Sequence, residues 1–125
     1  MKPQHKHLIV RAEVSRPFRS GDEARAADWL RGLVDAIGMH VVSGPHVAHV
    51  DKVGNEGITA CVLIETSHCT LHVWDRDEPP LVQLDVYTCS SLNLDLVFLH
   101  LNAFEPTKVE WKFLDREHGL YEITV

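Results

Sequence analysis

The sequence from residue 57 to residue 74 is Gly57-Ile-Thr-Ala-Cys-Val-Leu-Ile-Glu-Thr-Ser-His-Cys-Thr-Leu-His-Val-Trp74. Its first half, Ile58 to Ile64, is an unbroken apolar run with the length of a strand buried on both faces, which predicts a strand at the centre of a sheet. Beyond Ser67, apolar and polar residues alternate up to Trp74, the period of a half-buried strand. The stretch therefore predicts two successive strands of one sheet.

The flanking sequence predicts further strands and two helices. A capping box at Ser20-Gly-Asp-Glu23 starts the first helix, whose apolar stripe ends before Gly38. Two prolines make residues 75 to 80 a turn, because proline cannot donate to a strand ladder. The remaining expected elements are a strand at 7–14, a strand and loop through Pro45 to Asn55, a strand at 82–87, a helix at 92–104 and a strand around Val109, Trp111 and Phe113.

Strands in hairpin-like succession with two interspersed helices predict an α+β fold. We expect a two-layer sandwich with both helices packed on one face of a largely antiparallel sheet. With 125 residues and 45% hydrophobic content, residues 1-125 are expected to form a single domain with a modest core.

Composition narrows the classes of partner. The formal net charge of −6 argues against nucleic acid or an anionic membrane, because either favours a basic surface. No stretch approaches the length of a membrane span, and the basic start lacks the apolar segment of a signal peptide. The three cysteines do not form a disulfide framework. We therefore expect a cytoplasmic protein that binds a small molecule, with no nucleic-acid or membrane partner.

Ser67 is the candidate reactive residue. It lies at the end of the apolar run, with His68 and His72 one and five residues later. A serine beside a histidine at a strand end is by itself usually structural. Here the hydroxyl can act as a nucleophile on its own backbone, at the carbonyl of Thr66, to give an ester. β-Elimination then releases residues 1-66 and leaves dehydroalanine, which hydrolyses to a pyruvoyl group on residues 67-125.

The pattern around Ser67 resembles the prokaryotic S-adenosylmethionine decarboxylases, which are self-processing precursors. The likeness begins at His7-Leu8 and covers most of the chain. Its motifs are the Gly57-Ile58-Thr59 element, the hydrophobic strand, Ser67-His68-x-x-x-His72-x-Trp74 and Asp85-Val86-Tyr87-Thr88-Cys89. The resemblance implies cleavage between Thr66 and Ser67, with His72 as the base and Thr59 as the hydroxyl that holds the oxyanion.

The resemblance also implies a pyruvoyl cofactor derived from Ser67, with no pyridoxal phosphate. In that family the ketone forms a Schiff base with the substrate amine and accepts electrons as carbon dioxide leaves. Cys89 matches the acid that returns a proton, a role suited to thiols, whose ordinary pKa is about 8.5. The implied product is the aminopropyl donor for spermidine synthesis. Relatives are homodimers with sites near the subunit contact, so we expect at least a homodimer.

The expected substrate-binding residues depart from the family pattern. Thr66 replaces a glutamate before the cleaved serine, and Val53 replaces an aromatic residue that stacks on adenine. Trp74 is a core residue or a pocket wall. The carboxylate that follows it in relatives corresponds to Asp75, Asp77 or Glu78, because this chain is about two residues longer there.

Those departures leave a second substrate class open, since family members with the same chemistry decarboxylate ornithine or arginine. A third reading is an unprocessed, non-catalytic binding protein, although Ser67, His72 and Cys89 together argue against it.

Nine histidines suggest metal pairs at His5/His7, His46/His49 or His68/His72. None has a third ligand at zinc-site spacing, so we expect no metal.

Strict alternation from residue 67 to residue 72 places the Ser67 and His72 side chains on opposite faces of one strand. We therefore expect the pleat to break near Thr66 or Ser67, in a strained turn that favours the acyl shift. Clean extended geometry through residues 65 to 69 argues against this hypothesis.

Overall fold

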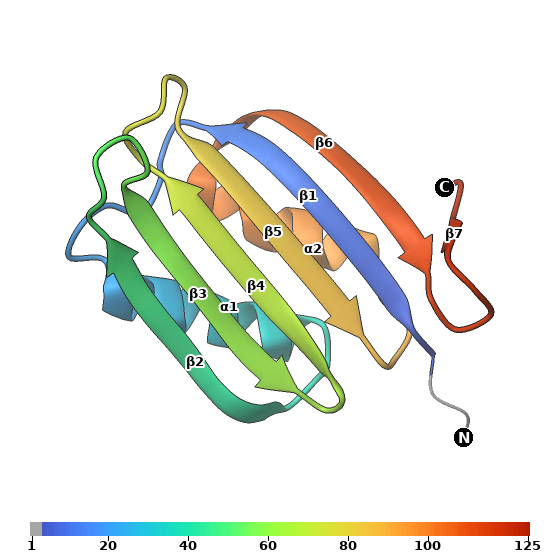
Figure 1. Ribbon diagram of the computed structural model, residues 1–125. Helices are drawn as coiled ribbons and strands as arrows, with labels where there is room; N and C mark the ends of the chain where they lie inside the picture. The colour runs from blue at the N-terminus through green and yellow to red at the C-terminus, as the bar shows by residue number, and fades with distance from the viewer. Residues whose placement is uncertain (1–3) are drawn as a thin grey trace.

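The computed structural model describes residues 4–125, which form one layer of strands and one layer of helices (Figure 1). The longest helix has 14 residues, and none in this part of the chain could cross a membrane. In chain order the elements are β1 (Lys6–Val14), α1 (Glu23–Ala36), β2 (Val41–Val50), β3 (Gly57–Ile64), β4 (Ser67–Trp74), β5 (Leu81–Thr88), α2 (Leu94–Leu101), the 3-10 helix η1 (Asn102–Phe104), β6 (Pro106–Asp115) and β7 (Tyr121–Glu122).

The seven described strands form one sheet in the order β2-β3-β4-β5-β1-β6-β7, and every neighbouring pair is antiparallel. Both α1 and α2 lie behind the same face of this sheet (Figure 1). The predicted α+β two-layer sandwich is therefore confirmed. We call the face without helices the open face.

The core lies between the sheet and the helices. Alternate residues of β1, β4 and β5 are buried, as the period of a strand with one covered face requires. Helix α1 adds its apolar stripe of Ala26, Trp29, Leu30, Leu33 and Val34, and α2 adds Val97 and Leu101. The open face is consequently the side from which a ligand can approach the middle strands.

Two details of the fold correct the sequence analysis. Strand β3 lies next to the edge strand β2, and β5 occupies the centre. Strand β3 is also buried on one face only, since its residue Leu63 is 46% exposed. Helix α1 begins after Asp22, whose side chain accepts a hydrogen bond from the Arg19 backbone. The predicted capping box at Ser20 does not form, although Gly38 does follow the helix end, at φ 76°.

Gly57 is required by the close approach of two strands. A Cβ at this position would overlap the carbonyl oxygen of Val73 on the neighbouring strand β4. We expect Gly57→Ala to lower the free energy of unfolding by about 3 kcal/mol, because the backbones must separate to admit the methyl group. Urea denaturation followed by circular dichroism measures this loss.

Gly54→Ala is the matched control for that substitution. Gly54 has a positive φ of 85°, but no atom lies within 4 Å of a Cβ added there. Backbone strain alone should then cost about 1 kcal/mol. Equal losses for the two variants would contradict the close-approach argument.

Candidate functional site

Ser67 begins β4 directly after a two-residue turn. Ile64 pairs with Ser67 across this turn, and between them Thr66 has a φ of 52°. A threonine in the left-handed region is a strained residue, because its branched side chain crowds the backbone. The expected strained turn is therefore present, and it lies at the bond where cleavage is expected.

The Ser67 side chain is held at this turn. The residue is 7% exposed, and its Oγ donates a hydrogen bond of 2.9 Å to the carbonyl oxygen of Glu65. The hydroxyl of Thr66 donates to the same oxygen at 2.8 Å. The nucleophile thus lies beside its own backbone, shielded from bulk water.

Cys89 reaches the same carbonyl from another strand. It follows the end of β5, which is paired with β4 through His68 and Tyr87. Its Sγ lies 2.8 Å from the carbonyl oxygen of Glu65. Ser67 and Cys89 therefore have a common acceptor, and their side chains lie close together. The other cysteine of β4, Cys69, is fully buried, and burial raises the pKa of its thiol to about 12.

Thr59 and His72 form a second pair. They are direct cross-strand partners on β3 and β4, and Thr59 Oγ1 lies 2.6 Å from His72 Nδ1. The ring of Trp74 lies 6.1 Å from that of His72, and its indole N–H donates to Asn55 Oδ1 at 2.8 Å. The structure therefore brings together two residues that were expected to act in the same reaction, and it places them on the open face.

The structure does not bring Ser67 and His72 together within one chain. Burial alternates regularly along the whole of β4, with Ser67 among the buried residues and His72 among the partly exposed ones. Five residues of extended strand also separate them by roughly 16 Å. The strained turn lies before β4, so the expected break in the pleat does not move Ser67 to the face of His72.

Within residues 4–125, His72 lines several cavities. The largest of them, about 380 Å³, is lined by residues of β2, β3 and β4 and includes Thr59 and Cys61. One of about 270 Å³ extends toward β5 and β1, and one of about 140 Å³ adjoins Trp74. A bigger cavity of about 730 Å³ lies elsewhere, beside α1 and Phe104. The hollows that meet the candidate catalytic groups are those on the open face.

The other expected substrate-binding residues lie away from this pair. Val53 is 92% exposed and lines none of the three cavities. The carboxylate of Asp75 is buried, with the guanidinium of Arg19 at 3.7 Å. Glu78 is exposed in the β4–β5 loop. Within one chain, Trp74 alone of the four expected binding residues lies beside His72.

Sequence reasoning gave no role to a group of motif residues that the structure gathers near His72 on the open face: His7, His68, Asp85 and Tyr87. His7 Nε2 lies 3.8 Å from Asp85 Oδ1, and the rings of His7 and His68 both approach Tyr87. Interaction with His7 lowers the pKa of Asp85, although burial opposes the shift. Burial and the nearby His7 lower the pKa of His68. These residues belong to the motifs quoted above, but the sequence did not show that their side chains meet.

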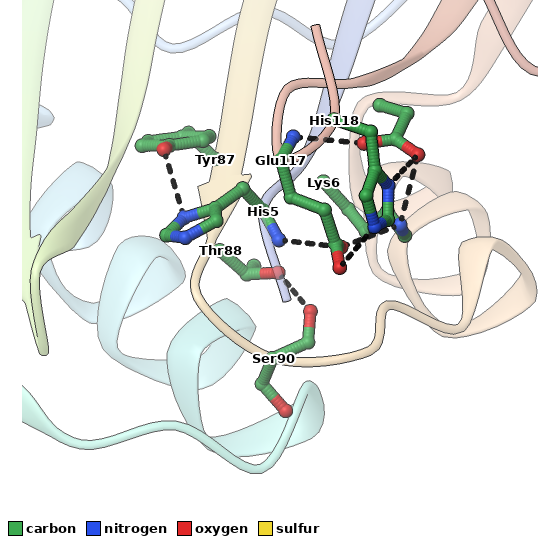
Figure 2. A network of polar contacts seen from close by, with 8 residues as sticks. His5, Lys6, Tyr87, Thr88, Ser90, Glu117 and His118 are labelled. Carbon is green, nitrogen blue, oxygen red and sulfur yellow. Dashed lines mark hydrogen bonds and ion pairs between the residues drawn. The ribbon is translucent and has the colours of Figure 1, made fainter. Parts of the chain in front are cut away.

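A second polar cluster lies at the ends of β1 and β6 (Figure 2). Asp115, Glu117 and His118 place their ligand atoms within 4.8 Å of one another, as a metal site requires. The ammonium of Lys6 lies 3.6 Å from Asp115 and 3.0 Å from Glu117. The hydrogen bond to Glu117 raises the pKa of Lys6. An internal cation therefore neutralises these carboxylates.

Comparison with known proteins relates this chain to S-adenosylmethionine decarboxylases in three ways. The sequence model of a family described as S-adenosylmethionine decarboxylase matches residues 6–117. The S-adenosylmethionine decarboxylase proenzyme of Archaeoglobus fulgidus is 36% identical over 78 residues, which cover 55% of this chain and 68% of that protein. The crystal structure of the adenosylmethionine decarboxylase from Aquifex aeolicus superposes with a TM-score of 0.73 at 22% identity, covering 100% of this chain and 98% of that one.

Proposed function

The chain belongs to the S-adenosylmethionine decarboxylase family, and on that premise we propose that it is a self-processing precursor of an enzyme that decarboxylates S-adenosylmethionine. The observation that carries the proposal is the strained Thr66–Ser67 junction, with the Cys89 thiol on the same carbonyl oxygen as the serine. The ornithine, arginine and binding-protein readings are not favoured, because the matched family and relative are both described as S-adenosylmethionine decarboxylases.

Processing starts at Ser67. Its Oγ attacks the carbonyl carbon of Thr66, the C–N bond breaks, and the nitrogen of Ser67 takes up a proton to leave an ester. Elimination then removes the Cα proton and breaks the Cβ–Oγ bond, releasing the Thr66 carboxylate. Strain at Thr66, with its φ of 52°, favours these steps because cleavage relieves it.

The position of Ser67 also fits a pyruvoyl group. Cleavage in the β3–β4 turn leaves fragment 1–66 paired with fragment 67–125 along both strands, so the new terminus stays in place. The pyruvoyl group supplies the electron sink for loss of carbon dioxide. In this proposal Cys89, whose Sγ lies 2.8 Å from the carbonyl oxygen that also accepts from Ser67, donates a proton to the substrate carbon. The buried surroundings of residue 67 exclude water from that proton transfer.

The base for processing comes from a second copy of the chain. His72 and Thr59 lie on the open face, away from Ser67 of their own chain. A homodimer that brings the open face of one copy to the Ser67–Cys89 end of the other completes the site. The hydroxyl of Thr59, 2.6 Å from His72 Nδ1, orients the imidazole for this role.

Complementation between inactive variants tests the shared site. We expect neither His72→Ala nor Ser67→Ala to be cleaved when expressed alone. Coexpressed, the His72→Ala chain should be cleaved, because its partner supplies the missing imidazole. Intact mass of differently tagged, copurified chains gives the result.

The matched control pairs His72→Ala with the double variant Ser67→Ala/His72→Ala, which forms the same dimer without any imidazole at position 72. Cleavage should then be absent. Mixed dimers that form with Ser67→Ala but remain uncut would refute the shared site.

Intact mass of the purified wild-type protein, measured under denaturing conditions, tests the proposed function itself. Two fragments that meet at Thr66 and Ser67, the second with a pyruvoyl mass, are expected. Cyanoborohydride trapping with S-adenosylmethionine, ornithine and arginine then identifies the substrate, and the adduct should form with S-adenosylmethionine. A single uncut chain that traps nothing would overturn the proposal.

A further inference from the structure

The 270 Å³ cavity beside His72 contains a carboxylate that no step above uses. Its lining residues come from three strands of the open face: Ile9, Val10 and Arg11 from β1, His72 from β4, and Gln83 and Asp85 from β5. Gln83 is the direct cross-strand partner of His72, so the candidate base and Gln83 lie side by side in the cavity wall. Any ligand held by His72 therefore has Asp85 within the same hollow.

The carboxylate of Asp85 is not neutralised by the arginine of the cavity. The guanidinium of Arg11 is instead paired with two other carboxylates, those of Glu13 at 3.3 Å and Glu110 at 3.5 Å. Lys112 is the partner of Ile9 on β6, but its ammonium binds Glu122 at 3.2 Å. These contacts leave the negative charge of Asp85 facing the cavity.

The imidazole of His7 lies next to the carboxylate of Asp85. Its Nδ1 lies 3.3 Å from the Arg116 guanidinium, which donates to it, so Nε2 carries the proton and faces the carboxylate at 3.8 Å. That Nε2 is buried without a hydrogen-bond partner among residues 4–125. The side chain of Asp85 nevertheless remains 43% exposed, so a ligand can reach its oxygens.

We propose that Asp85 is a specificity-determining residue that binds the positively charged sulfonium of S-adenosylmethionine in this cavity. The inference rests on the proposed function. A sulfonium has no proton to donate in a hydrogen bond, so a site recognises it by its positive charge, through a nearby negative group or an aromatic face. A carboxylate in a partly closed hollow does so more strongly than in open water, because the effective dielectric constant is lower.

Two probe ligands isolate the charge. 5′-Dimethylsulfonio-5′-deoxyadenosine is a cation and 5′-methylthioadenosine is its neutral counterpart, and neither has a carboxylate to lose. Calorimetry measures the binding of each to the wild-type protein and to Asp85→Asn. We expect the substitution to weaken binding of the cation about tenfold, the loss typical of one charged partner, and to leave the neutral probe unchanged.

Asp35→Asn is the matched control. It removes one negative charge from an exposed position of helix α1, behind the sheet, without lining the cavity, so neither probe should be affected. Gln83→Lys is a second variant. It adds a positive charge to the cavity, so it should weaken binding of the cationic probe and leave binding of the neutral probe unchanged. Equal losses for both probes in Asp85→Asn, or no loss for either, would overturn the inference. An uncut wild-type chain would instead count against the proposed function, and the binding comparison would still test Asp85.

Discussion

Ser67→Ala is expected to abolish cleavage completely, so that the purified protein has the mass of one intact chain. Alanine has no oxygen to attack the Thr66 carbonyl, and no other route to a pyruvoyl group exists at that position. Because the side chain contributes one hydrogen bond, to Glu65, the fold should survive with a loss of about 1 kcal/mol. Denaturing mass spectrometry measures cleavage and circular dichroism checks the fold.

Thr66→Ala is the control for that experiment. The Thr66 hydroxyl donates to the same carbonyl oxygen as Ser67, so its removal disturbs the turn equally but leaves the nucleophile. We expect this variant to be cleaved. Two fragments from Ser67→Ala would show that another residue is the nucleophile.

Cys89→Ala is expected to leave some cleavage but to lower turnover severely. The thiol lies on the carbonyl of Glu65 beside the reacting residue, and loss of a positioned general acid typically costs about 10²- to 10⁴-fold in rate. Release of labelled carbon dioxide from S-adenosylmethionine by the cleaved fraction measures the effect. Normal turnover by this variant would mean that the acid is another group.

Two further cysteine variants separate the possible causes of such a loss. Cys89→Ser keeps a donor for the Glu65 carbonyl but is a far weaker acid, so turnover should stay low if acidity matters. Cys69→Ala removes a buried thiol whose pKa is raised to about 12, and its turnover should be normal. Recovery of full activity in Cys89→Ser would indicate a positioning role.

Local pattern predicted most of the elements. The alternation in residues 68 to 74 and 82 to 87 reappears as β4 and β5, each with one buried face. The apolar run of Ile58 to Ile64 misled the prediction, because partly exposed Leu63 and Cys61 lie on the open face. An apolar residue on a half-exposed face has the same sequence signature as a buried one, so composition could not assign the position of β3 in the sheet.

The candidate site was also predicted in part from the sequence. Strand alternation predicted a strained turn at Thr66 or Ser67, and the motifs named Thr59 and His72 without saying that they meet. The pairing of Thr59 with His72 follows from a two-residue turn, since a short hairpin sets the register of the next strand. The meeting of Cys89 with Ser67 at one carbonyl could not be derived, because it depends on where β5 ends relative to β4.

By itself, the sequence determined most of the strands, the two helices, the single open face and the candidate serine, because period, turn residues and motif spacing are local properties of the chain. Tertiary structure alone decided which side chains meet. It showed that the turn before β4 does not bring Ser67 to the face of His72, as a break in the pleat would have done, and it placed Asp85 beside His72 in one cavity. The physical reason is that strand order and the choice of covered face arise from packing of the helices on the whole sheet, and no single segment encodes either.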